Sequence, residues 1–159
     1  IDNGKSGTQR GLAEKDAKLK DEILKVNGSM IYSKIGEKYT IEDLLYGLML
    51  RSGNDAALAI ATNVASSLEN FVYMMNEVAA KIGMKNTNFV NPSGLEENDG
   101  TGNMSTVYDM ALLTRYAMNN EHYRRIVSTK DILVKSSLKT YKWINKNKLL
   151  FDYTEEYTS

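Results

Sequence analysis

Apolar side chains recur at helical spacing on either side of a short polar break, and this is the clearest pattern in the chain. Thr40 and Asp43 stand three residues apart in a capping-box arrangement, which predicts the start of a helix. Its apolar face is Ile41, Leu44, Leu45, Leu48 and Met49. After the break at 52–54 the period resumes with Ala57, Ile60, Ala61 and Val64. We therefore predict two buried helices that are joined by a short turn.

More helices are predicted further along the chain. Ser67 and Gly83 frame one of them as its start and its C-terminal stop. Its apolar stripe is Phe71, Met74, Met75, Val78, Ala79 and Ile82. A short helix around Glu121–Ile126 follows another one, which begins at a cap formed by Ser105 or Thr106. The inward side of that helix is predicted to be Val107, Met110, Ala111, Leu113 and Ala117.

The rest of the chain predicts a little sheet and a long connection. Lys130–Val134 and Lys139–Ile144 have the β-branched and aromatic content of strands, and we expect them to pair as a hairpin. The stretch 86–102 is rich in Asn, Gly and Ser and holds the single proline, which is typical of a long irregular connection. The predicted fold class is mainly α, with four to five packed helices and a short C-terminal β-hairpin.

The two ends of the chain are polar. The first half of Ile1–Lys20 indicates a loop or linker, and Leu12–Lys25 fits a charged helix. We divide the chain into an irregular lead-in (1–26), a helical domain (27–153) and a frayed tail (154–159).

Composition narrows the function classes. Lys+Arg and Asp+Glu both number 20, so the net charge is zero, which argues against nucleic-acid binding because that requires a basic face. The chain has no Cys and one His, so we expect no transition-metal site and no cofactor. No run of about 18 apolar residues occurs, so no membrane span is expected, and no signal peptide is found. The chain begins with Ile rather than Met, which fits an excised piece of a longer protein.

The polar break places two polar side chains, those of Ser52 and Asn54, on a short turn. Gly53 can take backbone angles that are closed to other residues, and Asn54 or Asp55 is a good N-cap for the second helix. Ser52 and Asn54 are then held between two buried helices, which is the rigid support that functional sites need. The alternative is an ordinary interhelical turn in which Gly53 bends the chain and Asn54 caps the helix.

Three stretches around this turn carry a family resemblance. They are GEKYTIEDLLYGLMLRSGNDAALAIA at 36–61, NTNFVNPSGL at 86–95 and MSTVYDMALLTRYAM at 104–118. Ser-Gly-Asn in this setting resembles the Ser-x-Asn motif of the penicillin-interacting serine enzymes, and more narrowly that of the D-alanyl-D-alanine carboxypeptidases, the low-molecular-weight penicillin-binding proteins. The likeness covers roughly 27–153, and the three stretches follow the order of that family.

The resemblance implies a fold and an activity. The chain would be the helical part of the α+β beta-lactamase/transpeptidase-like fold, in an enzyme that cleaves D-Ala from peptidoglycan stem peptides and binds beta-lactams at the cell envelope. By resemblance, Ser52 relays a proton towards the leaving group, Asn54 hydrogen-bonds the substrate amide, and Gly53 and Asn54 line the substrate. The nucleophile of the family lies in a Ser-x-x-Lys motif before this turn, and a Lys-Thr-Gly strand after it engages the substrate carboxylate.

Both outer motifs are missing from this sequence in the family order. No Ser-x-x-Lys precedes Ser52 and no Lys-Thr-Gly occurs, so we expect the isolated chain to be inactive. Ser136 and Lys139 do match Ser-x-x-Lys, but they follow Ser52 and lie on a predicted strand, where residues three apart point to opposite faces. Lys139-Thr140-Tyr141 begins like Lys-Thr-Gly, but Tyr141 would crowd the site.

The remaining candidates have plainer interpretations. His122 is expected on the surface of a short helix, and Asp43 and Asp109 are expected to serve the first turns of their helices. The methionines at 74–75 are interpreted as core. The alternative function is a non-catalytic helical module that binds a partner or forms a homo-oligomer through apolar surfaces normally covered by the rest of the enzyme.

Overall fold

The computed structural model describes residues 15–21, 23, 26–96 and 99–151. Within them the helices are α2 (Ile41–Arg51), α3 (Asn54–Val64), α4 (Leu68–Lys81), α5 (Val107–Ala117), α6 (Glu121–Ser128) and the 3-10 turn η2 (Lys148–Leu150). The strands are β1 (Asp16–Lys18), β2 (Lys38–Thr40), β3 (Asp131–Lys135) and β4 (Thr140–Ile144). The prediction of a mainly helical fold with a C-terminal hairpin is confirmed. None of the described helices is long and apolar enough to cross a membrane.

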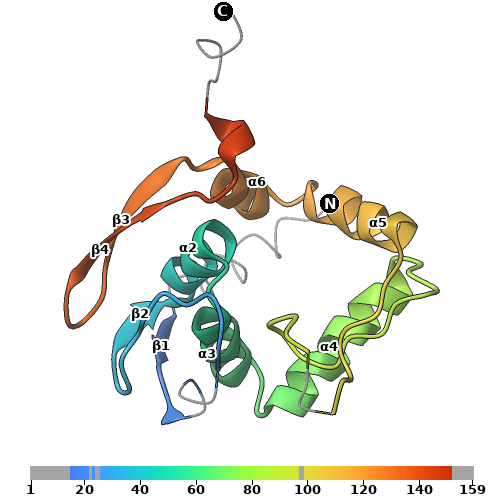
Figure 1. Cartoon of the computed structure of the whole chain (residues 1–159), viewed down its shortest axis with the longest axis horizontal. Helices are drawn as coiled ribbons and strands as arrows, with labels where there is room; N and C mark the ends of the chain where they lie inside the picture. The colour runs from blue at the N-terminus through green and yellow to red at the C-terminus, as the bar shows by residue number, and fades with distance from the viewer. Residues whose placement is uncertain (1–14, 22, 24–25, 97–98, 152–159) are drawn as a thin grey trace, which may run out of the picture.

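The core is built around α2 and α3. The predicted capping box starts α2, since Asp43 N donates to Thr40 Oγ1 (3.0 Å) and Thr40 N donates to Asp43 Oδ2 (3.2 Å). The α2 helix packs against α3, α6, β2 and β4 (Figure 1). Its buried residues include Ile41, Leu44 and Leu50. On α3 the buried positions are mostly alanines, which let the two helices approach closely.

The C-terminal hairpin covers one side of this core. Strands β3 and β4 are antiparallel, with Asp131 opposite Ile144 and Lys135 opposite Thr140. Trp143 is buried, and its ring lies 5.5 Å from the ring of Tyr141, measured between centroids. The hairpin therefore brings its aromatic face against α2 and, through the rings of Tyr141 and Tyr39, against β2.

A second small sheet replaces part of the charged helix predicted for Leu12–Lys25. Asp16–Lys18 forms β1, which pairs antiparallel with β2, and Ala17 between two exposed residues is fully buried. The helical interpretation is wrong for these three residues because tertiary pairing with the distant strand β2 decided their conformation. Residues 12–14, 22 and 24–25 lie outside the described part, and so does the whole predicted tail, 154–159. Our division at 26/27 stays a prediction.

Helices α4 and α5 begin where the sequence predicted but bury much less than expected. Ser67 caps α4 and Thr106 caps α5, each accepting a hydrogen bond from the backbone N–H three residues on (3.1 Å). In these two helices only Ala79 and Asp109 are buried. Val107, predicted inward, is 91% exposed. The predicted inward face is wrong for α5, where Val107, Met110 and Ala111 are exposed. The α4 stripe is confirmed in part, since Ala79 is buried and Phe71 packs against the core, whereas Met74 and Val78 are exposed.

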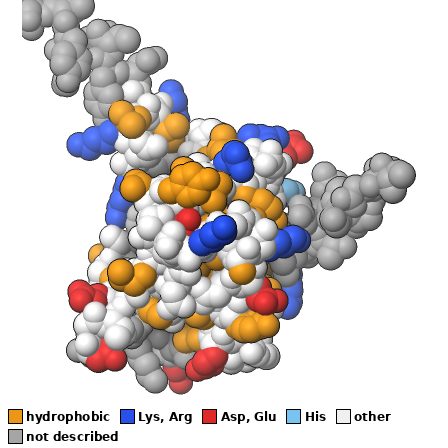
Figure 2. Space-filling model, turned by 90° about the vertical axis from the view of Figure 1, so that its right-hand side faces the viewer, with side chains coloured by type: hydrophobic (Ala, Val, Ile, Leu, Met, Phe, Trp, Pro, Cys, Tyr) orange, Lys and Arg blue, Asp and Glu red, His pale blue; other side chains and the backbone are white. Residues whose placement is uncertain are grey.

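Helices α4 and α5 border an apolar groove. It has a volume of about 690 Å³ and lies between α2, α4, α5 and α6. Its apolar lining includes Leu45, Met49, Val78, Leu113 and Ile126. Figure 2, which looks onto the side of the molecule that carries α4 and α5, shows further hydrophobic side chains at the surface.

Candidate functional site

The Ser52–Asn54 turn joins α2 to α3, as predicted, but its backbone differs from the prediction. Ser52, the C-cap of α2, takes the left-handed conformation with φ 56° and ψ 41°. Gly53 has an ordinary φ of −71°. The prediction that Gly53 supplies the special backbone angles is therefore wrong. A left-handed non-glycine residue stores strain of about 1–3 kcal/mol, and such residues cluster at functional sites.

Gly53 is required for another reason, which is space. A Cβ at this position would lie 3.0 Å from Ile31 Cγ2, 3.2 Å from Asp55 Oδ1 and 3.2 Å from the carbonyl oxygen of Gly47. The backbone oxygen cannot move aside without disturbing α2. Gly53 thus lets the segment that contains Ile31 pass directly over the turn.

The predicted side-chain cap of α3 is absent. Gly53 is the N-cap and makes no side-chain hydrogen bond, although Asp55 Oδ1 accepts from Ala56 N in the first turn (3.0 Å). Asn54 instead donates its Nδ2 to the carbonyl oxygen of Asn27 (2.8 Å). The Asp55 carboxylate accepts from the backbone N–H groups of Ile31 (2.9 Å) and Ser33 (3.2 Å). Both side chains therefore hold the 27–33 segment against the turn, a long-range task that outweighs local capping.

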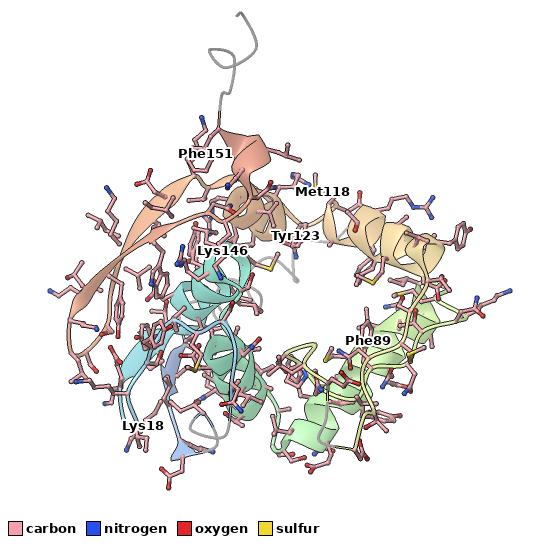
Figure 3. All side chains as sticks on the ribbon, viewed as in Figure 1. Lys18, Phe89, Met118, Tyr123, Lys146 and Phe151 are labelled. Carbon is pink, nitrogen blue, oxygen red and sulfur yellow. The ribbon has the colours of Figure 1, made fainter. Side chains whose placement is uncertain are left out.

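A second distant segment, at the end of β4, reaches the same turn. Lys146 N donates to the carbonyl oxygen of Leu50 (3.0 Å), and Arg51 Nη1 donates to that of Ile144 (3.0 Å). Lys146 Nζ donates to Ser29 Oγ (3.1 Å), and the carbonyl oxygen of Ser29 accepts from Asn54 N (2.8 Å). Figure 3 shows Lys146 beside α2. The hairpin end, the 27–33 segment and the turn thus form one connected unit.

A third segment comes from the long 86–102 connection. Asn91 orders it by donating Nδ2 to the carbonyl oxygen of Leu95 (2.8 Å) and accepting from Gly94 N (2.8 Å). Gly28, with φ +84°, lies between this segment and the turn: a Cβ there would stand 3.1 Å from Asn54 Nδ2 and 3.7 Å from Leu95 Cδ2. Leu95 therefore lies against the loop that holds the Asn54 amide.

Ser52 and Asn54 have hydrogen-bond donors and acceptors that no described residue of the protein uses. Ser52 is exposed, and within the described part of the chain its hydroxyl has no hydrogen-bond partner. Asn54 is 8% exposed, and one of its two amide N–H groups is used by Asn27. A hydroxyl and an amide that can each donate and accept are suited to bind a peptide bond and to relay a proton. The described residues hold no cluster of His, Asp and Glu suited to a metal ion.

The Ser136–Lys139 pair serves the hairpin turn. It lies between β3 and β4, so the prediction that these residues sit on a strand is wrong. Ser136 Oγ is buried, donates to the Glu37 carboxylate and accepts from Lys139 N (3.1 Å). The Lys139 ammonium lies 4.5 Å from the centroid of the Tyr141 ring. The hydroxyl proton of Ser136 is thus directed to a carboxylate and not to a lysine.

Glu37 is the centre of a buried polar cluster beneath this turn. It accepts from Ser136, from Lys34 N (2.9 Å) and from the hydroxyl of Tyr141 (2.9 Å). Burial raises the pKa of Glu37, but these hydrogen bonds together lower it by a larger amount, so the pKa lies below the ordinary value. Burial and the neighbouring Glu37 carboxylate raise the pKa of Tyr141 to about 12. Glu37 is therefore an ionised anchor for the hairpin.

The other candidates fill structural places. We predicted that the Asp109 carboxylate binds the first turn of α5. It accepts instead from Asn86 N (2.8 Å) and Thr87 Oγ1 (2.8 Å). This buried carboxylate therefore ties the long connection to α5. His122 is half-buried at the groove, with its Nδ1 3.2 Å from Arg125 Nη2. Met74 is 47% exposed, so its interpretation as core is wrong.

Sequence reasoning missed three members of the site: Ser29, Leu95 and Lys146. These residues lie far from the turn in the sequence, and no periodic pattern of apolar residues distinguishes them. The available signals were the turn-forming dipeptide Asn27-Gly28 and the quoted stretch 86–95. Both indicate loops, but neither indicates that these loops contact the Ser52–Asn54 turn.

Comparisons with known proteins agree with the resemblance. The sequence profile of the D-alanyl-D-alanine carboxypeptidase family matches residues 12–158. The D-alanyl-D-alanine carboxypeptidase DacF of Bacillus subtilis is 36% identical over 129 residues, which are 80% of this chain and 32% of that protein. A D-alanyl-D-alanine carboxypeptidase of a Streptomyces species is 34% identical over 147 residues, covering 84% of this chain and 49% of that protein.

Solved structures show the same likeness. A variant of a Streptomyces DD-transpeptidase matches 89% of this chain with a TM-score of 0.81 and 30% identity, over 60% of its own length. A D-alanyl-D-alanine carboxypeptidase of Mycobacterium tuberculosis matches 89% of this chain with a TM-score of 0.81 and 29% identity, over 53% of its own length. The chain thus spans between about a third and three fifths of these relatives.

Proposed function

The chain belongs to the D-alanyl-D-alanine carboxypeptidase family, and from this premise we propose that it carries one wall of the active site of a serine-type D-Ala-D-Ala carboxypeptidase. The intact enzyme cleaves the terminal D-Ala of peptidoglycan stem peptides through an acyl-enzyme, binds beta-lactams at the same site and works outside the cytoplasmic membrane, at the cell envelope. The observation that carries the proposal is the Ser52–Asn54 turn, which is held by two segments distant in the chain and keeps its polar groups available.

Each residue of the turn has a role in this proposal. Asn54 pairs with the peptide bond of the substrate, since its free amide N–H and its Oδ1 complement a carbonyl and an N–H group. Ser52 passes a proton to the departing D-Ala nitrogen, a task for which an exposed hydroxyl without a competing partner is suited. Gly53 keeps the turn close to the 27–33 segment.

The nucleophile and its lysine are the parts that this sequence does not present in the family order. Acyl transfer needs an activated hydroxyl facing the turn, and Ser136 is turned towards Glu37 instead. We therefore propose that the chain by itself binds substrate weakly and does not form an acyl-enzyme.

A titration tests the substrate site. We expect N-acetyl-D-Ala-D-Ala, added to the ¹⁵N-labelled chain, to shift the NMR signals of Ser52 and the Asn54 side-chain amide, and the L-Ala-L-Ala isomer to leave them unchanged. Asn54→Ala should weaken this binding at least about five- to tenfold, because both hydrogen bonds of the side chain to the peptide group are lost. Absence of any shift at millimolar dipeptide, or equal shifts with both isomers, contradicts the proposal.

A second candidate function is self-association through the apolar groove. The exposed apolar positions of α4 and α5 favour it, since an amphipathic helix normally buries its stripe. We propose that a second copy covers the groove in solution. Light scattering should then show a dimer that Leu113→Glu dissociates, whereas Val107→Glu, which also places a carboxylate at an apolar position of α5 but outside the groove, leaves it intact. A wild-type chain that stays monomeric at high concentration contradicts this.

A further inference from the structure

Lys146 is a cation fixed at the rim of the Ser-Gly-Asn turn. Its backbone N–H donates to the carbonyl oxygen of Leu50, two residues before Ser52 (3.0 Å). Its ammonium donates to Ser29 Oγ (3.1 Å), and the backbone carbonyl of the same Ser29 accepts from Asn54 N (2.8 Å). Ser29 is therefore a one-residue bridge between the ammonium and the residue proposed to hold the substrate amide.

The charge of Lys146 has no counter-charge in the described part of the chain. The one ion pair there joins Arg125 to Glu42 on other elements. Asp55, the acid of the turn, is 2% exposed and accepts from the backbone N–H groups of Ile31 and Ser33. An ammonium has three N–H donors, and the Ser29 hydroxyl uses one. Two donors of an exposed, positioned cation remain for a ligand.

A purely structural role for the ammonium explains less of this geometry. A cation near the end of α2 favours the helix dipole, but there it is the backbone N–H of Lys146 that donates to the Leu50 carbonyl, and Arg51 is the basic residue of the last turn. The ammonium reaches instead across to the 27–33 segment. Fixing the side chain in this way reduces the entropy that a lysine loses when it binds an anion.

We propose that Lys146, positioned by Ser29, recognises a carboxylate on the peptide substrate and makes the site selective for acidic peptides. The carboxylate belongs to a residue that precedes the terminal D-Ala-D-Ala, because Asn54 holds the peptide backbone on the other side of Ser29. The contact is a charge-assisted hydrogen bond, which is stronger than a neutral one and weakens as salt is added. This inference rests on the proposed function, since it names a specificity residue of the same site.

Two matched peptides test it. N-acetyl-D-Glu-D-Ala-D-Ala and N-acetyl-D-Gln-D-Ala-D-Ala differ only in one charge, and their affinities for the whole chain are measured by NMR titration. We expect the acidic peptide to bind roughly fivefold more tightly at low salt, a size typical of one partly exposed charge pair. The preference should shrink at about 0.5 M salt, where the Debye length is only a few ångströms.

Variants separate recognition from structure. Lys146→Met should abolish the preference by weakening only the acidic peptide, and Lys146→Arg should keep it. Lys148→Met is the matched control, because Lys148 is also exposed but makes no side-chain contact to the turn among the described residues; it should behave as wild type. Equal binding of both peptides to the wild type overturns the inference while the proposed function stands. Equal weakening of both peptides by Lys146→Met also overturns it, and binding of neither peptide to the wild type overturns both proposals.

Discussion

At the scale of single residues, the turn needs one residue with a left-handed backbone and one without a side chain, and two adjacent residues meet these needs. Ser52 carries the left-handed backbone, whereas Gly53 provides room for Ile31. A glycine beside a strained serine is a different arrangement from a glycine that is itself strained. The serine is held in a conformation that it would not choose alone, and the bonds made by Asn54 and Asp55 hold it there.

Gly53→Ala tests this division. The added methyl group would lie 3.0–3.2 Å from Ile31, Asp55 and the Gly47 carbonyl, so we expect overpacking to destabilise the chain by about 1–3 kcal/mol in urea unfolding. Gly102→Ala is the control, because its nearest contact would be an ordinary 3.8 Å and it has no left-handed φ. Equal stability of the two variants would show that the turn has more room than the structure gives it.

At the scale of elements, the C-terminal hairpin depends on one buried carboxylate. Glu37 precedes β2 and joins that strand to the β3–β4 turn through Ser136 and to β4 through Tyr141. Lys38 N also donates to Ser137 Oγ (2.9 Å). Because Lys146 follows β4, the carboxylate that anchors the hairpin also supports one edge of the candidate site.

Glu37 gives the fold a predictable acid sensitivity. Its pKa in the folded chain lies below the ordinary 4.5, so the unfolded chain binds more protons in that range. The stabilisation is complete above about pH 4.5 and is lost as the pH falls through the lower folded value. We expect Glu37→Gln to lower the free energy of unfolding near neutral pH by about 1–3 kcal/mol, and by less in acid, because the amide cannot accept all of these bonds.

Tyrosine variants provide the controls for this prediction. Tyr141→Phe removes one donor and keeps the carboxylate, so it should reduce the acid dependence of urea unfolding. Tyr108→Phe removes the same hydroxyl from an exposed position and should leave that dependence unchanged. An acid dependence that Glu37→Gln does not alter would show that other carboxylates control unfolding in acid.

At the scale of the whole molecule, the helices form two unequal parts around the groove. The part made of α2, α3 and the two sheets has a dense core, whereas α4 and α5 contribute only Ala79 and Asp109 as buried residues, with Phe71 of α4 packed partly against that core. The candidate site belongs to the dense part, with one loop contributed by the connection between α4 and α5. A rigid site and an open groove therefore coexist in one chain.

Incubation with benzylpenicillin tests whether this assembly can act alone. We expect no increase in the intact mass of the chain, because among the residues that the structure describes no serine combines exposure at the turn with a lysine positioned as its base. An adduct mapped to Ser136 would contradict the structural role assigned to that hydroxyl. An adduct on Ser52 would show that the proposed proton relay can itself be acylated; Ser52→Ala and Ser136→Ala identify the site by loss of the adduct.

The sequence by itself determined the helix starts, the position of the turn and the hairpin. Capping residues such as Thr40 and Thr106 accept a hydrogen bond from the backbone N–H three residues on, so the pattern that predicts them is local in the sequence. Family likeness in the quoted stretches also marked Ser52 and Asn54 as site residues, which stays a prediction.

Only the tertiary structure decided which groups meet at the turn. The Asp55 carboxylate binds a backbone N–H 24 positions away, and the Lys146 ammonium binds a hydroxyl 117 positions away. No local period encodes such contacts, because they depend on how the helices and the hairpin pack. The same packing left the apolar stripe of α5 exposed, since a helix buries its stripe only where another element stands against it.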